Sequence, residues 1–214
     1  MEYLALAWDI AVHLDKHLAA LLAQYGTWVY AILFLIVFAE TGFVVTPFLP
    51  GDSLLFVAGA LCGAGSMDLW VLNGTLIAAA ILGNSVNYSI GRYLGPKVFH
   101  WENSRFFNKA ALLKTHDFYE RHGGKTLVIT RFIPILRTFA PFVAGIGAMT
   151  YVRFQAYNIG GAVLWVGSLS VAGYLFGNLP IIQNNLSLVI LAIVVVSTLP
   201  AAIAYLKHRR SAHP

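Results

Sequence analysis

Four ionisable residues interrupt stretches of this sequence that are otherwise apolar: Glu40, Asp52, Arg131 and Arg137. A charge at the centre of a membrane helix costs about 2.5–3.5 kcal/mol on insertion scales, so each needs a reason to be there. Guanidinium groups are permanently charged and bind phosphate through two parallel hydrogen bonds. Carboxylic acids in a partly dry cavity can take up and release protons near neutral pH. Two acids and two arginines could therefore bind an anion and couple its movement to protons.

The same residues also have a purely structural interpretation, in which acids and arginines form two salt bridges between segments. Such pairing is compatible with a binding role. Arg131 and Arg137 are six residues apart, so a regular helix would place them on different faces. Pro134 lies between them, and a helix break there would let both guanidinium groups converge on one cavity.

The composition places these residues in a membrane protein. The chain has 214 residues, of which 58% are apolar and 11% charged, and its mean hydropathy is +0.72. In soluble domains roughly a quarter of all residues are charged, so this composition excludes a soluble or disordered protein. Residues 69–91 and 154–206 carry no formal charge. Since a span needs about 20 apolar residues, the first stretch is one membrane helix and the second is two, at 154–177 and 181–206.

Lysine and arginine residues predict the orientation. Nine of the 14 basic residues lie between Arg92 and Arg137, and Lys207-His-Arg-Arg210 follows the last span. By the positive-inside rule both regions face the cytoplasm, which predicts a multi-pass protein with a cytoplasmic C-terminus. Residues 1–68 include one basic and six acidic residues, so we expect the N-terminal segment to lie on the outer, non-cytoplasmic side of the membrane. Residues 1–26 are predicted to form an amphipathic helix in the membrane interface.

Counting the crossings predicts a segment that enters and leaves the membrane on one side. If both final spans cross, Arg153 is cytoplasmic, and so is the basic amphipathic segment 92–125. The apolar segment 126–150 therefore begins and ends on the same side, and its two short arms reach roughly the midplane. Two prolines are expected to break this hairpin: Pro134 and Pro141.

The first half repeats this design with the opposite orientation. Residues 27–65 form an apolar segment that again enters and returns, followed by the span 69–91. Its expected breaks are Pro47, Pro50 and Gly51. Matching broken segments in two inverted halves are typical of a transporter's binding site. The sequence thus predicts one all-α membrane domain over residues 1–214, with two inverted repeats and an extra C-terminal transmembrane helix. Each repeat holds an amphipathic helix, a re-entrant hairpin and a span.

Several motifs carry a resemblance to a known family. They are Phe38-Ala-Glu40-Thr-Gly42, Pro47-Phe-Leu-Pro-Gly-Asp-Ser-Leu54, Gly91-Arg92-Tyr-Leu-Gly95 and Arg131-Phe-Ile-Pro-Ile-Leu-Arg137 with Ala144-Gly145. Together they resemble the DedA family of bacterial inner-membrane proteins, within the larger SNARE-associated or VTT-domain group. The resemblance covers nearly the whole chain. It implies two re-entrant hairpins that face each other, and transport that depends on the proton motive force.

The resemblance also implies a substrate and residue roles. Family members are implicated in returning undecaprenyl phosphate, the lipid carrier of cell-wall synthesis, across the membrane, and eukaryotic relatives scramble phospholipids. Glu40 and Asp52 match the family's essential acids, which implies a role in proton coupling. Arg131 and Arg137 match its essential arginines, which implies that they bind the substrate phosphate.

One position departs from the family pattern. Many relatives carry an acid where this chain has Asn84, and an asparagine cannot carry a proton. Two interpretations stay open for the polar residues of this span: they are hydrogen-bonding glue between helices, or they line the cavity. The residues considered for the cavity lining are Asn84, Asn87, Tyr88 and Arg92.

Other functions fit the sequence less well. Gly51-Asp-Ser-Leu54 matches the signature of a serine hydrolase family, but that chemistry needs a neighbouring base, and all seven histidines lie outside the apolar segments. We therefore expect neither an enzyme nor a cofactor, and the single cysteine gives no metal site. The basic segment 92–125 lies beside the bilayer, which favours anionic lipid heads over nucleic acid as its partner. Three GxxxG pairs are typical of close helix packing: Gly59/Gly63, Gly91/Gly95 and Gly173/Gly177.

The sequence therefore predicts a flippase that moves a phosphate-headed lipid, in the first place undecaprenyl phosphate, across the bacterial inner membrane with protons as the coupling ion. Two transport alternatives stay open: a proton-coupled antiporter for small ions or drugs, and a phospholipid scramblase. A protein that only maintains membrane organisation would show no flux. The chain is compatible with a homo-oligomer.

Overall fold

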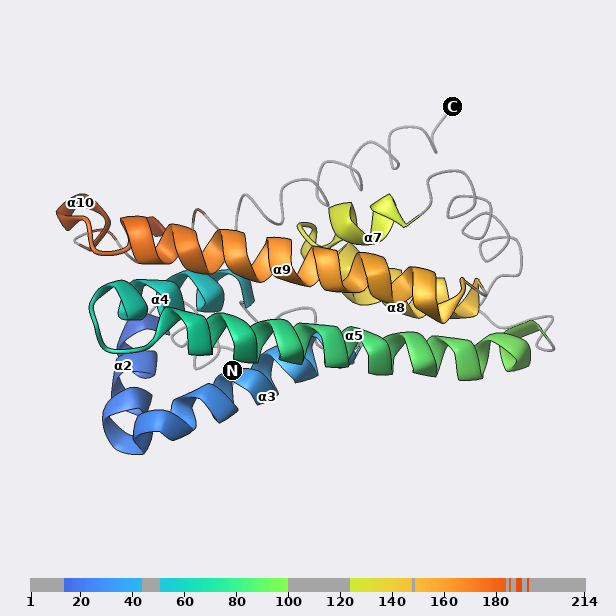
Figure 1. The fold of residues 1–214 in the computed structure, drawn as a ribbon, viewed down its shortest axis with the longest axis horizontal. Helices are drawn as coiled ribbons and strands as arrows, with labels where there is room; N and C mark the ends of the chain where they lie inside the picture. The colour runs from blue at the N-terminus through green and yellow to red at the C-terminus, as the bar shows by residue number, and fades with distance from the viewer. Residues whose placement is uncertain are drawn as a thin grey trace, which may run out of the picture. The chain divides into compact units, whose positions relative to one another are not determined.

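The described part of the chain is helical. The computed structural model describes residues 14–43, 51–99, 124–147 and 149–183, together with 185, 188–189 and 192. No strand occurs among these residues, and the predicted all-α class is confirmed for them. In chain order the elements are α2 (Leu14–Tyr25), the 3-10 turn η1 (Gly26–Trp28), α3 (Val29–Gly42), α4 (Gly51–Gly63), α5 (Leu69–Phe99), α7 (Lys125–Thr130), α8 (Pro134–Ile146), α9 (Tyr151–Phe176) and α10 (Pro180–Gln183) (Figure 1).

Among the described residues, three helical stretches are long and apolar enough to cross a membrane: His17–Gly42, Leu69–Leu94 and Tyr151–Phe176, each of 26 residues. At 1.5 Å per residue each is about 39 Å long, which exceeds the roughly 30 Å of bilayer hydrocarbon. The last two stretches correspond to the predicted spans 69–91 and 154–177. The predicted span 181–206 falls almost entirely outside the described residues, as do residues 1–13 and 100–123.

The first of these stretches bends at Gly26. This glycine has a φ of +54°, a backbone conformation that side chains with a Cβ rarely adopt. Figure 1 shows α2 and the start of α3 meeting at an angle there. The bend coincides with the predicted boundary between the amphipathic helix 1–26 and the hairpin 27–65.

The arms of both predicted hairpins are separate helices. α3 and α4 are the arms of the first, and the residues between them that contain Pro47 and Pro50 lie outside the described part of the chain, while Gly51 begins α4. α7 and α8 are the arms of the second. Ile133 between them is extended, with φ −118° and ψ 107°, and Pro134 is the first residue of α8. Proline suits that position because the first turn of a helix needs no backbone N–H.

Two helix bounds and one predicted helix break differ from the sequence-based expectations. α5 continues to Phe99 because arginine and lysine, which end the uncharged stretch, are good helix formers. α9 already begins at Tyr151, before the charge of Arg153, for the same reason. The prediction that Pro141 breaks the second hairpin is wrong, since it lies inside α8. A proline removes a single backbone hydrogen bond, and Pro141 is itself buried by packing.

Asp68 determines where α5 begins. Its Oδ1 accepts hydrogen bonds from the backbone N–H groups of Trp70 and Val71, at 2.8 and 2.9 Å. These N–H groups have no partner within the helix, so an aspartate here stabilises its first turn. The backbone N–H of Asp68 donates to the Tyr30 hydroxyl at 2.8 Å, which ties this turn to α3.

The described chain divides into two compact units. Unit 1 consists of Met1–Leu35, Phe48–Leu76 and Val166–Pro214, and unit 2 of Ile36–Pro47 and Ile77–Trp165. Each of the helices α3, α5 and α9 therefore has one part in unit 1 and the other in unit 2. Three of the four ionisable residues singled out above belong to unit 2, and Asp52 belongs to unit 1.

In unit 1, α4 and α9 approach each other through glycine. A Cβ atom at Gly59 would overlap the carbonyl of Ser170, and one at Gly173 would overlap the carbonyl of Phe56. The side-chain amide of Asn178 donates to the Ala60 carbonyl at 3.0 Å. This close backbone packing is what the GxxxG pairs at these positions predict.

In unit 2, α5 is the helix against which α3 and α8 pack. A Cβ at Gly83 would overlap the Thr41 hydroxyl at the end of α3, and one at Gly91 would overlap the Phe142 carbonyl of α8. Gly83 and Gly91 are eight residues apart, so they lie on one face of α5. That face therefore receives one arm of each predicted hairpin.

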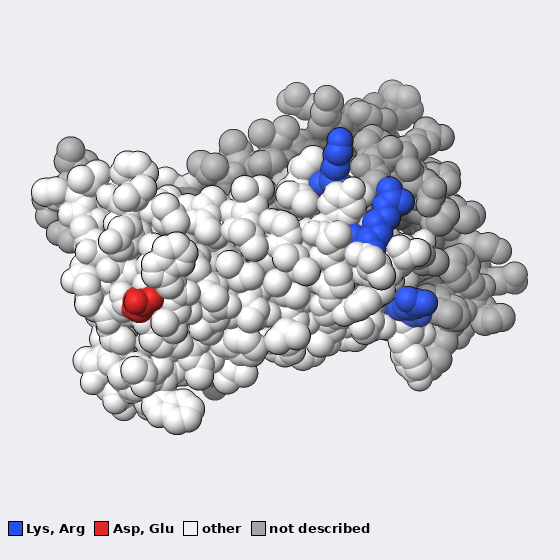
Figure 2. Space-filling model, viewed as in Figure 1, with Lys and Arg blue, Asp and Glu red and all other residues white. Residues whose placement is uncertain are grey.

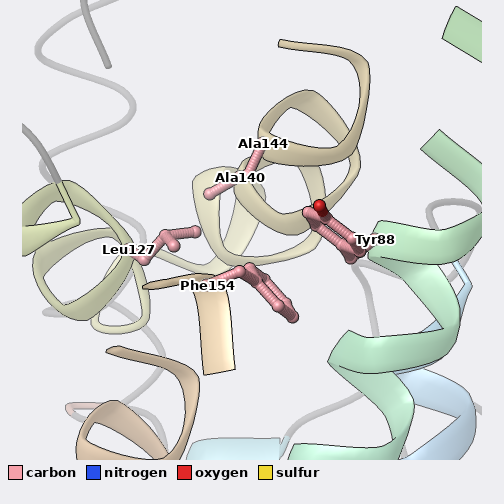
Figure 3. Packing of buried hydrophobic residues seen from close by; sticks show 5 residues of the cluster. All are labelled: Tyr88, Leu127, Ala140, Ala144 and Phe154. Carbon is pink, nitrogen blue, oxygen red and sulfur yellow. The ribbon is translucent and has the colours of Figure 1, made fainter. Parts of the chain in front are cut away.

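An apolar cluster holds α8 and α9 to the same part of α5. The rings of Tyr88 and Phe154 stack with their centroids 4.3 Å apart. Figure 3 shows Ala140 and Ala144 of α8 beside these rings, with Leu127 of α7 completing the cluster. All five residues are buried.

Replacing Gly173 by alanine should destabilise the protein by about 1–3 kcal/mol, because the new methyl group overlaps a backbone carbonyl that cannot move freely. Gly167 lies on the same helix with open space where a Cβ would be, so Gly167→Ala should leave the melting temperature unchanged or slightly higher. Thermal unfolding of both variants in detergent measures the difference. Equal melting temperatures would contradict the close packing of α4 on α9.

Candidate functional site

A buried ion pair joins the first predicted hairpin to the second. Glu40 lies in the last turn of α3 and Arg137 in the first turn of α8, and Arg137 Nη2 donates to Glu40 Oε1. Their side chains are 0% and 5% exposed. The guanidinium carbon of Arg137 also lies 5.1 Å from the ring centre of Trp165, which adds a cation–π contact. Removing either partner of a pair buried to this degree would leave the other as an uncompensated charge and would strongly destabilise the protein.

Arg131 is held by a network of amides on α5 and α9. It is 3% exposed, and its Nη2 donates to Oδ1 of Asn158. Asn84 Nδ2 donates to the same oxygen at 3.2 Å, and Asn158 Nδ2 donates to the Ile81 carbonyl at 3.1 Å. Because a guanidinium can only donate, the atom of Asn158 that faces Arg131 is its oxygen, and the atom of Asn84 that faces this oxygen is its nitrogen. The network therefore fixes the orientation of both asparagines.

Asn87 connects α3 and α8 through a single amide group. Its Nδ2 donates to the carbonyl of Thr41 at 3.1 Å and to the carbonyl of Thr138 at 2.8 Å. The Thr41 carbonyl lies at the end of α3, where the helix offers no further N–H to accept from. Thr41 follows Glu40, and Thr138 follows Arg137. Asn87 therefore holds the backbone next to both partners of the ion pair.

The two arginines face one small recess. Its lining residues are Thr41, Asn84, Arg131, Arg137 and Trp165. The recess is closed to a sphere the size of a water molecule. It brings two positive charges and the neutral amide of Asn84 together, with the carboxylate of Glu40 bound to one of the arginines. An anion that enters must therefore open the recess. Within the described ranges no group of three His, Cys, Asp or Glu side chains lies close enough together to hold a metal ion.

The structure brings three of the four predicted charged residues to this recess or its ion pair: Glu40, Arg131 and Arg137. Asp52 lies in the first turn of α4, in unit 1, and is 8% exposed. Its predicted share in proton coupling stays a prediction.

The residues of α5 that were considered for the cavity lining divide into two groups. Asn84 lines the recess and also hydrogen-bonds to Asn158 of α9, and its lining of a substrate cavity stays a prediction. Asn87 bridges helices. Tyr88 lies in the apolar cluster with its hydroxyl donating to the Met149 carbonyl, and Arg92 is exposed with Nη1 3.5 Å from that hydroxyl. Neither lines the recess, because they lie one and two turns further along α5 than Asn84.

Sequence reasoning missed Asn158 and gave Trp165 no part in the site. Gln155 and Asn158 lie three residues apart near the start of a predicted span, and Gln155 Oε1 accepts from Asn158 Nδ2 at 3.0 Å. Two amide side chains on one face of a helix in an apolar stretch could have indicated a site, because polar groups there need hydrogen-bond partners from other helices.

Comparison with known proteins decides the family. The VTT domain model matches residues 49–175, more than half of the chain. Protein DedA of Escherichia coli strain K12 is 57% identical over 206 residues, which covers 95% of this chain and 94% of that protein. The chain belongs to the DedA family of VTT-domain membrane proteins.

Two less similar membrane proteins match as well. Uncharacterized membrane protein ML0287 of Mycobacterium leprae is 46% identical over 169 residues, covering 79% of this chain and 76% of that protein. Inner membrane protein YqjA of Escherichia coli strain K12 is 37% identical over 157 residues, which covers 71% of this chain and 69% of that protein. These are named as membrane proteins and not as enzymes. No solved structure matches the chain.

Replacing Asn87 by leucine, whose side chain has the same branching and the same number of heavy atoms, should destabilise the protein by about 2 kcal/mol, because two buried carbonyls lose a donor. Ser89 on the same helix is exposed and donates to the Ser85 carbonyl of its own helix, so Ser89→Ala should change stability by less than about 0.5 kcal/mol. Denaturation in detergent measures both. A stability loss no larger for Asn87→Leu than for Ser89→Ala would contradict the bridging role of Asn87.

Proposed function

We propose that this protein is a membrane lipid transporter that flips a phosphate-headed lipid, most of all undecaprenyl phosphate, across the bacterial inner membrane and is driven by the proton motive force. The observation that carries the proposal is the recess in which two buried arginines meet, one of them bound to a buried acid. Paired guanidinium groups suit a phosphate because each offers two parallel donors and a permanent charge. Membership of the DedA family supports it.

In the proposed cycle, Glu40 and the lipid phosphate compete for Arg137. While Glu40 is ionised it binds Arg137, and the recess stays closed. Protonation removes the negative charge of Glu40, so Arg137 is released and can bind phosphate together with Arg131. The hydrocarbon tail stays in the lipid phase throughout. We assign Asp52 a second proton-binding position in this cycle.

The lengths of the hairpin arms support a re-entrant arrangement. α4 and α8 have 13 residues each, or about 20 Å, which is too short to cross roughly 30 Å of hydrocarbon. The break before Pro134 leaves irregular backbone, which is tolerated at membrane depth only where protein or water covers it. We propose that the two hairpins enter from opposite sides as parts of two inverted repeats, and that both meet at the recess.

The surface charge of unit 2 supports a cytoplasmic position for the basic face of this unit. Arg92, Lys125 and Arg153 are exposed, whereas Glu40, the acid of this unit among the described residues, is buried. Figure 2 shows basic side chains on neighbouring parts of the surface. Each basic residue near a membrane adds about 1 kcal/mol of attraction to anionic lipids. By the positive-inside rule we propose that this face and the C-terminus are cytoplasmic.

Purified protein in liposomes, with labelled polyprenyl phosphate in one leaflet, should speed transfer of the lipid, and a pH gradient should increase the rate further. Arg137→Lys should reduce the rate by about 100-fold, because an ammonium group offers a point charge instead of two parallel donors. Glu40→Gln should remove the response to the gradient, because glutamine cannot release Arg137 by taking up a proton. Arg153→Lys, at an exposed arginine, should transport like the wild type.

Other outcomes would contradict the proposal. No acceleration by the wild type, with or without a gradient, would exclude lipid flipping. Normal rates in Arg137→Lys together with proton-driven flux of a small cation would favour an antiporter. Rapid movement of phospholipids in both directions without a gradient would favour a scramblase.

A further inference from the structure

Oδ1 of Asn84, a buried polar atom at the recess, has no hydrogen-bond partner among the described residues. The residue is 5% exposed and lines the recess. Its amide nitrogen is already used, because it donates to Asn158 Oδ1 at 3.2 Å. Arg131 donates to that same oxygen, so the Asn84 side chain cannot turn round without placing two oxygens against each other. A buried acceptor without a donor is unfavourable, which indicates that a donor reaches it in another state of the protein.

The surroundings of Asn84 limit what that donor can be. The recess is closed to a water-sized sphere, so it has no room for a bridging water in this state. The two arginines that share the recess are donors, and in the transport cycle they bind the oxygens of the substrate phosphate. An opened recess thus offers two guanidinium groups and one amide oxygen. The ligand that matches all three carries anionic oxygens and one O–H group on the same phosphorus.

We propose that Asn84 is a specificity-determining residue, whose Oδ1 accepts a hydrogen bond from the P–OH group of a singly protonated phosphate monoester. The inference rests on the proposed function, since the lipid phosphate must first reach Arg131 and Arg137. A monoester keeps a P–OH group until its second proton leaves, at a pH of about 6. A phosphodiester, such as the head of a glycerophospholipid, has no P–OH at that pH. Asn84 therefore favours lipids that end in a phosphate monoester.

An asparagine suits this task better than an ionised acid would. The amide oxygen accepts a hydrogen bond without adding negative charge next to the incoming anion. Its neighbour Asn158 is likewise neutral, so the positive charge of Arg131 is not offset on that side. The discrimination between esters then depends on one acceptor atom.

A matched pair of ligands tests the inference. A short-chain prenyl phosphate and its methyl ester each carry one negative charge at pH 5, and the first alone has a P–OH group. Full-length protein in nanodiscs should bind the monoester about tenfold more tightly than the methyl ester, measured by calorimetry. The readout is a ratio of two affinities on one protein, so a partly destabilised variant still reports it.

Two variants separate the acceptor from a structural role. Asn84→Leu removes the acceptor oxygen, and Asn84→Asp keeps one, while both lose the donation to Asn158. We expect the tenfold preference to vanish in Asn84→Leu and to persist in Asn84→Asp. A preference that survives in Asn84→Leu would come from the bulk of the methyl group, and equal loss in both variants would come from the bond to Asn158. Either result would overturn the inference.

The outcomes also separate this inference from the proposed function. If the wild type binds the two ligands equally, the role of Asn84 is wrong and phosphate binding by the arginines stands. If it binds neither ligand, phosphate recognition itself is contradicted, and with it the role of Asn84.

Discussion

The arrangement of unit 2 depends on the ion pair between Glu40 and Arg137, two residues that lie 97 positions apart in the chain. Each comes from an arm of a different predicted hairpin, and both side chains are buried. Removing one partner of such a pair leaves an uncompensated charge and typically costs about 3–5 kcal/mol. A pair of apolar residues could hold the helices equally well, so stability alone gives no reason for charges here. If the pair opens when Glu40 is protonated, its function in transport gives a reason for the charges.

The close approach of the hairpins makes this pair possible. Gly83 and Gly91 let α3 and α8 approach the same face of α5, and Asn87 between them donates to one carbonyl of each. Since these contacts hold the backbone beside Glu40 and Arg137, the two charges meet with little freedom to move apart. Small residues and one amide therefore position the site, and the arginines supply its chemistry.

Much of this organisation could be predicted from the sequence, because apolar length and charge spacing are local properties. The uncharged stretch 69–91 predicts the core of α5, and Pro134 between two arginines predicts the change of direction before α8. The sequence could not tell which acid meets which arginine, since that depends on how distant helices pack. For the same reason Asn158 was missed, and Pro141 was expected to end a helix that continues through it. A single proline costs one hydrogen bond, and tertiary packing can outweigh that loss.

In the proposed transport cycle, Glu40 and Arg137 act as one coupled, protonation-sensitive pair. A double-mutant cycle with Glu40→Gln, Arg137→Gln and both together, measured as unfolding free energy in detergent, tests it most directly. We expect a coupling energy of about 2 kcal/mol at alkaline pH, which disappears once the medium is acidic enough to protonate Glu40. Effects that add to within about 0.5 kcal/mol at every pH would contradict it.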